Sequence, residues 1–238
     1  MGRSGRLGPF LYRSGASGAL IMILLLTAYG RKEIALFSLF WTALAAGLWQ
    51  LHPAAALVPL AALAFTLSFF RDPPRRIPGG PETLVAPADG RVTDIADFPA
   101  GDHFAEPSVR VGIFLSVFDV HVNRTPCAGV VKSTKYTPGD FLDARDPDCA
   151  RRNERNDILI ERAPAGDRVL VRQISGAIAR RIVCACREND VLEKGQRVGM
   201  IKFGSRTELY VPSRSLAEVM VKVGDRVKGG ETVIARTR

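Results

Sequence analysis

A glycine followed directly by a serine, Gly204-Ser205, is the residue pair in this 238-residue chain that points most directly to chemistry. A serine hydroxyl can attack the carbonyl of the residue before it. Glycine leaves that carbonyl unshielded and tolerates the strained backbone that the attack requires. Most Gly-Ser pairs are only turns, so the flanking residues have to decide. Here the order KGxxxGxxxFGS ends at Ser205, and an apolar strand and the run VGDRVKGGETVIA follow it.

This order resembles the processing region of phosphatidylserine decarboxylases, in which the serine becomes a pyruvoyl group. Further segments resemble motifs of the same family in the same order, so the resemblance covers about residues 70 to 238. The short length and the FGSR sequence at the serine resemble a compact bacterial and archaeal branch of the family. The matching segments are 70–75 (FRDPPR), 87–90 (PADG), 114–126 (FLSVFDVHVNRTP), 139–142 (GDFL), 153–155 (NER) and 176–181 (GAIARR).

The resemblance implies an enzyme that converts phosphatidylserine to phosphatidylethanolamine and CO2 in phospholipid biosynthesis. Decarboxylating an amino acid needs an electron sink, which protein side chains do not offer. The chain carries no GxGxxG or P-loop fingerprint that would hold a nucleotide cofactor. A pyruvoyl group made from Ser205 fills this gap and forms a Schiff base with the substrate amine. Autocatalytic cleavage at Gly204-Ser205 then leaves a β chain, residues 1–204, and an α chain, residues 205–238.

Asp89 and His121 are the candidate bases, because a serine nucleophile needs a neighbouring base. An aspartate that orients a histidine is a recurrent arrangement around activated serines. Asp89 also fits the corner of an Asp-Gly turn, and His121 also fits a buried core histidine. Long members of the family carry a second histidine where this chain has Arg124, which stays protonated near neutral pH. Two interpretations stay open: His121 serves both self-cleavage and protonation of the substrate carbanion, or Asp89 acts without a relay.

The elements that must position these residues are mostly strands. From Leu84 onward, short apolar or alternating runs are separated by Gly, Pro, Asp and Asn, which predicts antiparallel strands. Segment 140–153 is polar and predicts an exposed loop. We therefore expect a mostly β domain, barrel-like or sandwich-like, with short helices. The predicted strands lie at 91–95, 109–115, 157–160, 168–174, 198–203 and 207–211.

Segments 88–95 and 223–235 also resemble the hairpins of biotinyl and lipoyl carrier barrels. That similarity supports an alternative from another class, a non-catalytic barrel module tethered to a membrane. Carrier domains display a modifiable lysine at a hairpin tip flanked by Met or Asp, and this sequence supplies no such tip. Decarboxylase chemistry therefore remains the favoured interpretation.

Apolar stretches at 16–29, 34–50 and 54–70 predict N-terminal hydrophobic helices. We expect residues 1–70 to form a membrane-anchoring region and residues 71–238 to form the decarboxylase domain. A 17-residue helix spans about 25 Å, slightly short of a hydrocarbon core of about 30 Å. Arginines flank the block on both sides, and the break at 51–53 has none. The positive-inside rule thus favours a hairpin, 34–50 out and 54–70 back, with cytoplasmic ends. Residues 16–29 would lie in the interface or thicken the hairpin. The alternative is a buried helical pair within a globular fold.

The formal net charge of +9 suits anionic membrane lipids better than nucleic acid, because no RNA-binding or zinc-finger motif accompanies it. The four cysteines show no CxxC spacing, so we expect reduced thiols and no metal site. The expected location is the cell membrane, with the catalytic domain on its cytoplasmic face. The expected partners are phosphatidylserine, anionic lipids and the chain's own α and β chains as a heterodimer. The sequence leaves open a higher oligomer and a diacyl or ether-linked serine lipid. The cysteines are Cys127, Cys149, Cys184 and Cys186.

Overall fold

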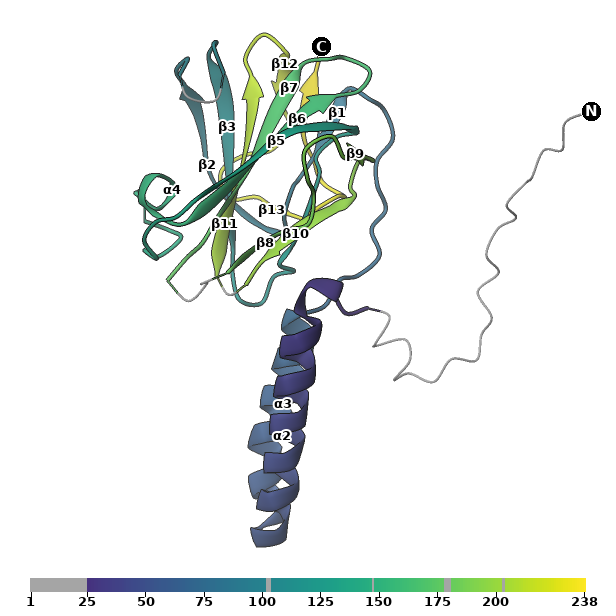
Figure 1. Ribbon diagram of the computed structural model, residues 1–238, viewed down its shortest axis with the longest axis vertical. Coiled ribbons are helices and arrows are strands. Elements are labelled where there is room, and N and C mark those ends of the chain that lie inside the picture. Colours follow the sequence, from purple (N-terminus) through teal and green to yellow (C-terminus); the bar gives the residue numbers. More distant parts are fainter. Residues whose placement is uncertain (1–24, 102–103, 147, 178–180, 203) are drawn as a thin grey trace, which may run out of the picture.

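A helical hairpin projects from a curled β domain in the computed structural model (Figure 1). The structure describes residues 25–101, 104–146, 148–177, 181–202 and 204–238. The predicted fold class, mostly β with N-terminal hydrophobic helices, is confirmed. Most of predicted segment 16–29 lies outside the described residues.

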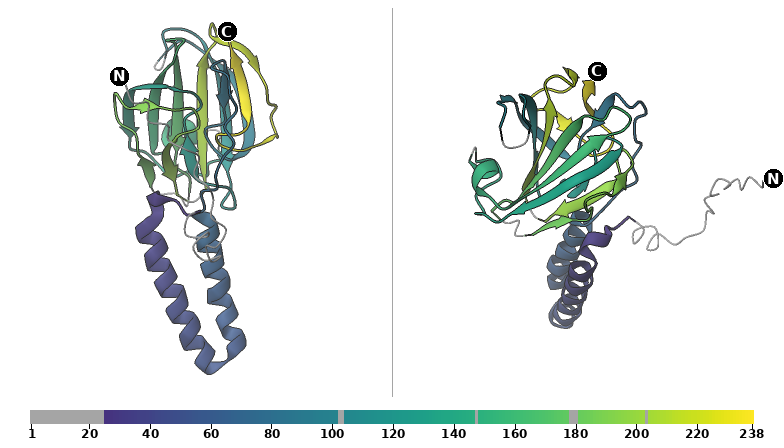
Figure 2. Two further views of the ribbon diagram at one scale, coloured as in Figure 1. Left: turned by 90° about the vertical axis from the view of Figure 1, so that its right-hand side faces the viewer. Right: turned by 45° about the horizontal axis from the view of Figure 1, so that its top comes forward.

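The hairpin consists of α2 (Arg31–Leu51) and α3 (Leu57–Phe69), which run side by side in opposite directions (Figure 2, left). A short 3₁₀ helix, η1 (Ala28–Gly30), precedes α2, and a second one, η2 (Pro53–Ala56), joins the two long helices. His52 has an extended backbone because the following proline disfavours the helical conformation before it. The hairpin predicted from 34–50 and 54–70 is therefore present as a pair of helices.

Most large apolar side chains of the hairpin face outward. Leu39 is 70% exposed and Val58 is 74% exposed. Residues Ala28–Leu51 are long and apolar enough to cross a membrane, and only 6% of that window is buried inside the protein. The 21 residues of α2 span about 31 Å, close to the thickness of a hydrocarbon core. The alternative of a helical pair buried in a globular fold is therefore wrong.

The β domain is built on an eight-stranded antiparallel sheet with the order β13-β2-β3-β11-β7-β6-β5-β9. One face of this sheet carries the main apolar core, which includes Ile113, Ile160 and Leu209. The runs predicted at 91–95, 109–115, 157–160, 168–174 and 207–211 all lie in these strands. Their bounds are β2 (Gly90–Phe98), β3 (Ser108–Leu115), β5 (Gly129–Thr137), β6 (Arg155–Arg162), β7 (Arg168–Ile174), β9 (Val191–Leu192), β11 (Ser205–Pro212) and β13 (Arg226–Val227).

Two three-stranded sheets complete the domain, with the orders β1-β14-β12 and β4-β10-β8. The predicted strand at 198–203 corresponds to β10, and the segments that resemble carrier hairpins meet where Arg226 of β13 pairs with Arg91 of β2. The second small sheet lies where the hairpin joins the domain (Figure 1). The strands are β1 (Thr83–Val85), β14 (Val233–Thr237), β12 (Leu216–Val219), β4 (Val122–Arg124), β10 (Arg197–Ile201) and β8 (Ile182–Cys184).

Segment 140–153 is not the fully exposed loop that its polarity predicted. It contains a short helix, α4 (Cys149–Arg152), and its residues Ala144, Cys149 and Asn153 are buried. The Asn153 side chain bonds to both backbone groups of Leu142 and donates to the Ser175 carbonyl, 2.9 Å away. These bonds fix the segment against the end of β7, although most of its side chains are polar.

The segment between the hairpin and the first strand is held by ionic contacts. Asp72 is buried and pairs with Arg124 at 2.6 Å and also with Arg197. Farther along, Arg75 pairs with Asp89 at 2.9 Å. The base of the hairpin is thereby fixed to the β domain.

Candidate active site

Ser205 begins β11 and stands opposite Leu115, the last residue of β3. Its side chain is fully buried, and its Oγ has no hydrogen-bond partner among the described residues. Gly204 before it has a φ of +60°, a left-handed conformation that favours glycine. A buried hydroxyl that lacks a partner is unusual and requires an explanation, which a reactive role would provide.

Gly176 lies against the carbonyl of Gly204. An ideal Cβ placed on Gly176 would lie 2.2 Å from the Gly204 oxygen, so only glycine fits there. The neighbouring Ser175 continues β7 opposite Ser205, because Ile174 pairs with Arg206. The Ser175 Oγ is also buried and has no partner in the described part of the chain. Sequence reasoning missed both roles, although Gly176 opens the GAIARR segment.

His121 is fully buried, and its imidazole is a neutral base. Its Nδ1 lies 2.9 Å from the Asp119 carbonyl, which can only accept, so Nδ1 carries the hydrogen and Nε2 carries the lone pair. Burial lowers the pKa of His121 to about 4, which keeps the ring neutral at physiological pH. Nε2 is buried without a partner among the described residues, and the Phe69 ring packs on the imidazole with centroids 4.3 Å apart.

The backbone brings His121 to the segment that ends at Ser205. The Ile201 N–H donates to the His121 carbonyl over 3.3 Å, at the end of β10. The turn from Leu115 to His121 therefore runs beside the link from Ile201 to Ser205, anchored at both ends. Asp119 stabilises this turn by accepting from the N–H and the Oγ of Ser116 at 2.8 and 2.7 Å.

Asp89 is held elsewhere. Its carboxylate pairs with Arg75 and accepts a hydrogen bond from the Gly229 N–H over 2.8 Å. Burial raises the pKa of Asp89, and the Arg75 guanidinium opposes that shift. No contact between Asp89 and His121 is found among the described residues, so the Asp-His relay is not formed in this structure.

Arg124, which occupies the position of the second histidine of long relatives, has a structural environment. Its guanidinium donates to Asp72 over 2.6 Å and to the Gly195 carbonyl over 3.0 Å, and the residue is buried. It therefore joins β4 to the segment that follows the hairpin.

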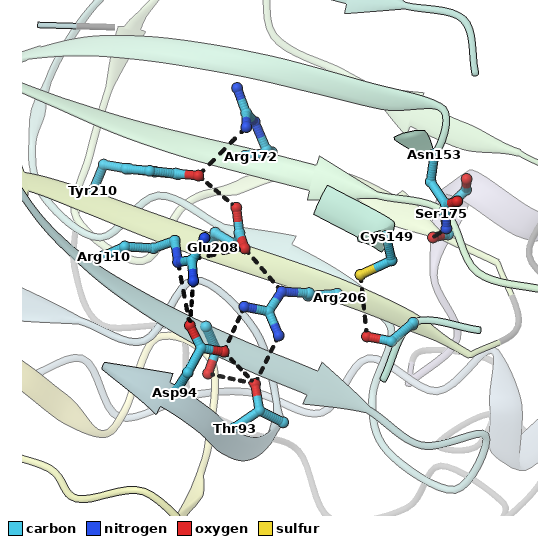
Figure 3. Close-up of polar contacts among 12 residues, drawn as sticks. Thr93, Asp94, Arg110, Cys149, Asn153, Arg172, Ser175, Arg206, Glu208 and Tyr210 are labelled. Atoms are coloured by element: carbon cyan, nitrogen blue, oxygen red, sulfur yellow. Dashed lines mark hydrogen bonds and ion pairs between the residues drawn. The ribbon is translucent and has the colours of Figure 1, made fainter. Parts of the chain in front are cut away.

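A network of charged side chains holds the strand that begins at Ser205 (Figure 3). Arg206 bonds to Asp94 at 2.5 Å, to Thr93 at 2.8 Å and to Glu208 at 2.8 Å. The Tyr210 hydroxyl donates to Glu208 over 2.7 Å. Alternation along the strand places Arg206 on the face opposite Ser205. The network therefore fixes β11 to β2 from behind the site, a feature that sequence reasoning also missed.

These residues suit an acyl shift from nitrogen to oxygen. The site offers the buried hydroxyl of Ser205, the adjacent carbonyl of the left-handed Gly204, and the neutral imidazole of His121 with a lone pair on Nε2. The Ser205 Oγ and the His121 Nε2 are not hydrogen-bonded to each other in this structure. A buried nucleophile and a base on the adjoining segment suit covalent catalysis once the two atoms come within hydrogen-bond reach.

Comparison with known proteins places the chain among the decarboxylases. A family model described as phosphatidylserine decarboxylase matches residues 62–235. The chain belongs to the phosphatidylserine decarboxylase family, and this membership excludes the alternative of a non-catalytic carrier module.

Three similar proteins are named phosphatidylserine decarboxylase proenzyme. The protein from Syntrophus aciditrophicus is 45% identical over 177 residues, which cover 74% of this chain and 82% of the relative. The protein from Carboxydothermus hydrogenoformans is 44% identical over 81% of this chain and 95% of the relative. The protein from Rhodopirellula baltica is 41% identical over 96% of this chain and 91% of the relative.

Proposed function

We propose that this chain is a membrane-bound proenzyme that cleaves itself between Gly204 and Ser205 and then decarboxylates phosphatidylserine to phosphatidylethanolamine. The observation that carries the proposal is the buried, unpartnered Ser205 Oγ beside the left-handed Gly204, with the neutral His121 held on the adjoining segment. The relatives' shared name, proenzyme, agrees with self-processing.

In the first step His121 Nε2 takes the Ser205 hydroxyl proton while Oγ attacks the Gly204 carbonyl. The C–N bond then breaks, and the Ser205 nitrogen leaves as an amine that receives this proton. The His121 Nε2, neutral again, then removes the Ser205 α-proton; the electron pair forms the Cα=Cβ double bond, the Cβ–O bond breaks, and Gly204 leaves as a carboxylate. The resulting dehydroalanine is hydrolysed, which releases ammonia and leaves a pyruvoyl group at the start of residues 205–238.

The pyruvoyl group supplies the electron sink for the loss of CO2. The chain's own residues do the remaining work. Gly176 leaves room for the Gly204 carbonyl, and the Phe69 ring packs on His121 and excludes water from one side of it. We propose that the His121 Nε2 takes a proton from the substrate ammonium group and delivers it to the carbon from which the carboxylate departs. With Arg124 engaged by Asp72, His121 would serve both steps.

Both chains would remain together after cleavage. β11 lies between β3 and β7 in the middle of the large sheet, and β14 lies between β1 and β12. The two fragments would thus share one core as a heterodimer, without a linking bond.

The hairpin supports a membrane location. Its apolar side chains face outward, and both of its ends join the β domain (Figure 1). We infer that the hairpin enters the membrane and that the domain sits at its cytoplasmic surface. Flanking segments that carry lysine and arginine stay on the cytoplasmic side of a membrane.

The test is the intact mass of the purified protein. Two fragments that break between Gly204 and Ser205 are expected, with the smaller one blocked to Edman sequencing. Ser205→Ala should abolish both cleavage and decarboxylation, because no hydroxyl remains to start the acyl shift. Ser213→Ala, at an exposed turn after β11, is the matched control. An active full-length chain would overturn the mechanism.

A further inference from the structure

Lys202 is a buried cation three residues before Ser205. Its side chain is 7% exposed, and it lies in the link between β10 and β11. The ammonium donates to the Glu33 carboxylate in the first turn of α2. A lysine ammonium has three donors, and Glu33 is its one side-chain partner among the described residues. In the described part of the chain no second acceptor for this ammonium is found, and a lysine ammonium can bond to a further acceptor.

The surroundings of Lys202 carry excess positive charge. The Lys202 N–H donates to the Arg181 carbonyl over 3.2 Å, and the Arg181 guanidinium acts electrostatically on the same Glu33 carboxylate. Arg181, whose side chain is exposed, thus adds a second positive charge near the Lys202–Glu33 pair. A group with a single negative charge would balance the cluster, and burial strengthens such an interaction.

Lys202 also lies where the hairpin meets the active site. Met200, two residues earlier, packs with Phe69 and Phe70 at the end of α3. Ile201 bonds to His121. If the hairpin lies in the membrane, this junction lies at the level of the lipid head groups.

A phosphatidylserine head group carries two anions, and only one of them suits a cation here. The carboxylate loses its charge as CO2 leaves, so a cation bound to it would stabilise the ground state more than the transition state. The phosphate keeps its charge throughout the reaction and carries the acyl chains toward the membrane.

We propose that Lys202, oriented by Glu33 and supported by Arg181, binds the phosphate of the lipid head group and positions the serine moiety at residue 205. This inference rests on the proposed decarboxylation and names the group that recognises its substrate. Lys202 is then a substrate-binding residue and Glu33 a positioning residue.

The experiment compares two substrates on full-length, processed protein in mixed micelles. One substrate is phosphatidylserine, and the other is a serine ether of the same diacylglycerol, which keeps the amine and the carboxylate but lacks the phosphate. Lys202→Met should lower kcat/KM for phosphatidylserine about 10- to 100-fold, mostly through KM, because a charge-assisted hydrogen bond is lost. It should lower kcat/KM for the ether by less than about threefold, and Lys202→Arg should restore part of the loss.

Glu33→Gln breaks the ion pair with the hairpin and keeps the ammonium, so it separates the orientation of Lys202 from its charge. It should lower kcat/KM far less than Lys202→Met does. Equal losses on both substrates, or a Glu33→Gln protein that reproduces the Lys202→Met loss, would show that Lys202 only fixes the hairpin to the domain.

Mass spectrometry separates these outcomes from failure of the proposed function. Parental protein that is not cleaved, or that is cleaved but inactive on both substrates, contradicts the decarboxylase mechanism itself. If Lys202→Met remains unprocessed, the comparison of the two substrates is made with Lys202→Gln, which removes the charge, keeps a polar side chain and should still raise KM for phosphatidylserine alone. A Lys202→Gln protein that treats both substrates as the parent does would contradict phosphate binding.

Discussion

The Cα of Gly176 faces the carbonyl oxygen of Gly204 so closely that a Cβ there would lie 2.2 Å from the oxygen. This oxygen belongs to the bond that we propose is cut. The alignment of the scissile carbonyl therefore depends on a glycine just beyond the end of β7, 28 positions earlier in the sequence.

Gly176→Ala should block or strongly slow self-cleavage. The added methyl group must displace the Gly204 carbonyl or separate the two strands, and such overpacking costs about 1–3 kcal/mol. The measurement is the fraction of cleaved chain over time on a denaturing gel. Gly79→Ala is the control, because nothing lies within 4 Å of a Cβ at Gly79. Parental processing in Gly176→Ala would show that the carbonyl tolerates displacement.

His121→Gln should impair both self-cleavage and decarboxylation, because glutamine cannot take the Ser205 proton. A positioned base contributes about 10²- to 10⁴-fold to a rate. Cleavage is followed by intact mass from a freshly synthesised precursor, and turnover by release of CO2 per cleaved chain. Normal maturation together with parental turnover would identify His121 as a core histidine.

The stability of the unprocessed fold should fall with acid because of His121. Burial lowers its folded-state pKa from 6.5 to about 4, so the unfolded chain takes up a proton first as the pH drops. The contribution of the neutral His121 to the free energy of unfolding is fully present above pH 6.5. It is lost progressively between pH 6.5 and 4, by about 3 kcal/mol in total. Urea unfolding of Ser205→Ala at pH 7 and 4.5, compared with Ser205→Ala/His121→Gln, measures it. If the unfolding free energy of the two proteins fell equally between pH 7 and 4.5, this result would contradict a buried neutral imidazole at His121.

Asp89→Asn should slow self-cleavage more than decarboxylation, through its ion pair with Arg75. The Arg75 side chain is 5% exposed, and removing the Asp89 charge leaves it with only the more distant carboxylate of Glu231, 4.0 Å away, among its described partners. The loss should therefore approach the cost of about 3 kcal/mol for breaking a buried ion pair. Asp89→Asn/Arg75→Met removes both charges and should recover part of the cleavage rate. A double variant as slow as Asp89→Asn would instead indicate that the carboxylate acts directly.

Charged substitutions on the hairpin should release the protein from membranes. Leu39→Glu/Val58→Glu introduces two charges at exposed apolar positions, each costing about 2.5–3.5 kcal/mol in a bilayer. Self-cleavage should continue because it is intramolecular, while activity on long-chain lipid should fall more than activity on a short-chain analogue. Deletion of residues 1–70 would be a poorer test, since it removes Phe69 from His121.

A pelleting assay after a high-salt wash measures the release. Val223→Glu, at an exposed position of the β domain, is the control for added charge. A doubly substituted protein that still pelleted with vesicles would show that the hairpin is not the main anchor.

The strands could be predicted because their residues alternate or run apolar between turn residues, and the hairpin could be predicted from long apolar stretches. Segment 140–153 could not, because its buried position depends on one asparagine side chain that bonds to Leu142 and Ser175. Local polarity does not reveal such a contact.

In the site, the order of motifs indicated Ser205 and His121, but not what surrounds them. The close approach of Gly176, the packing of Phe69 on His121 and the ion pair between Lys202 and Glu33 all join residues far apart in sequence. For Asp89, the motif suggested a partner for His121, whereas the fold gives its carboxylate to Arg75 and Gly229; a direct role for Asp89 in self-cleavage stays a prediction.

The central place of β11 has a consequence for how the molecule can be made. Before cleavage, the strand reaches its position between β3 and β7 as part of one chain, so folding is a first-order process. After the cut, denatured fragments would have to find each other in solution, and recovery would become second order and dependent on concentration. The chain must therefore fold before it is cut, and a mature enzyme that has once unfolded at low concentration is effectively lost.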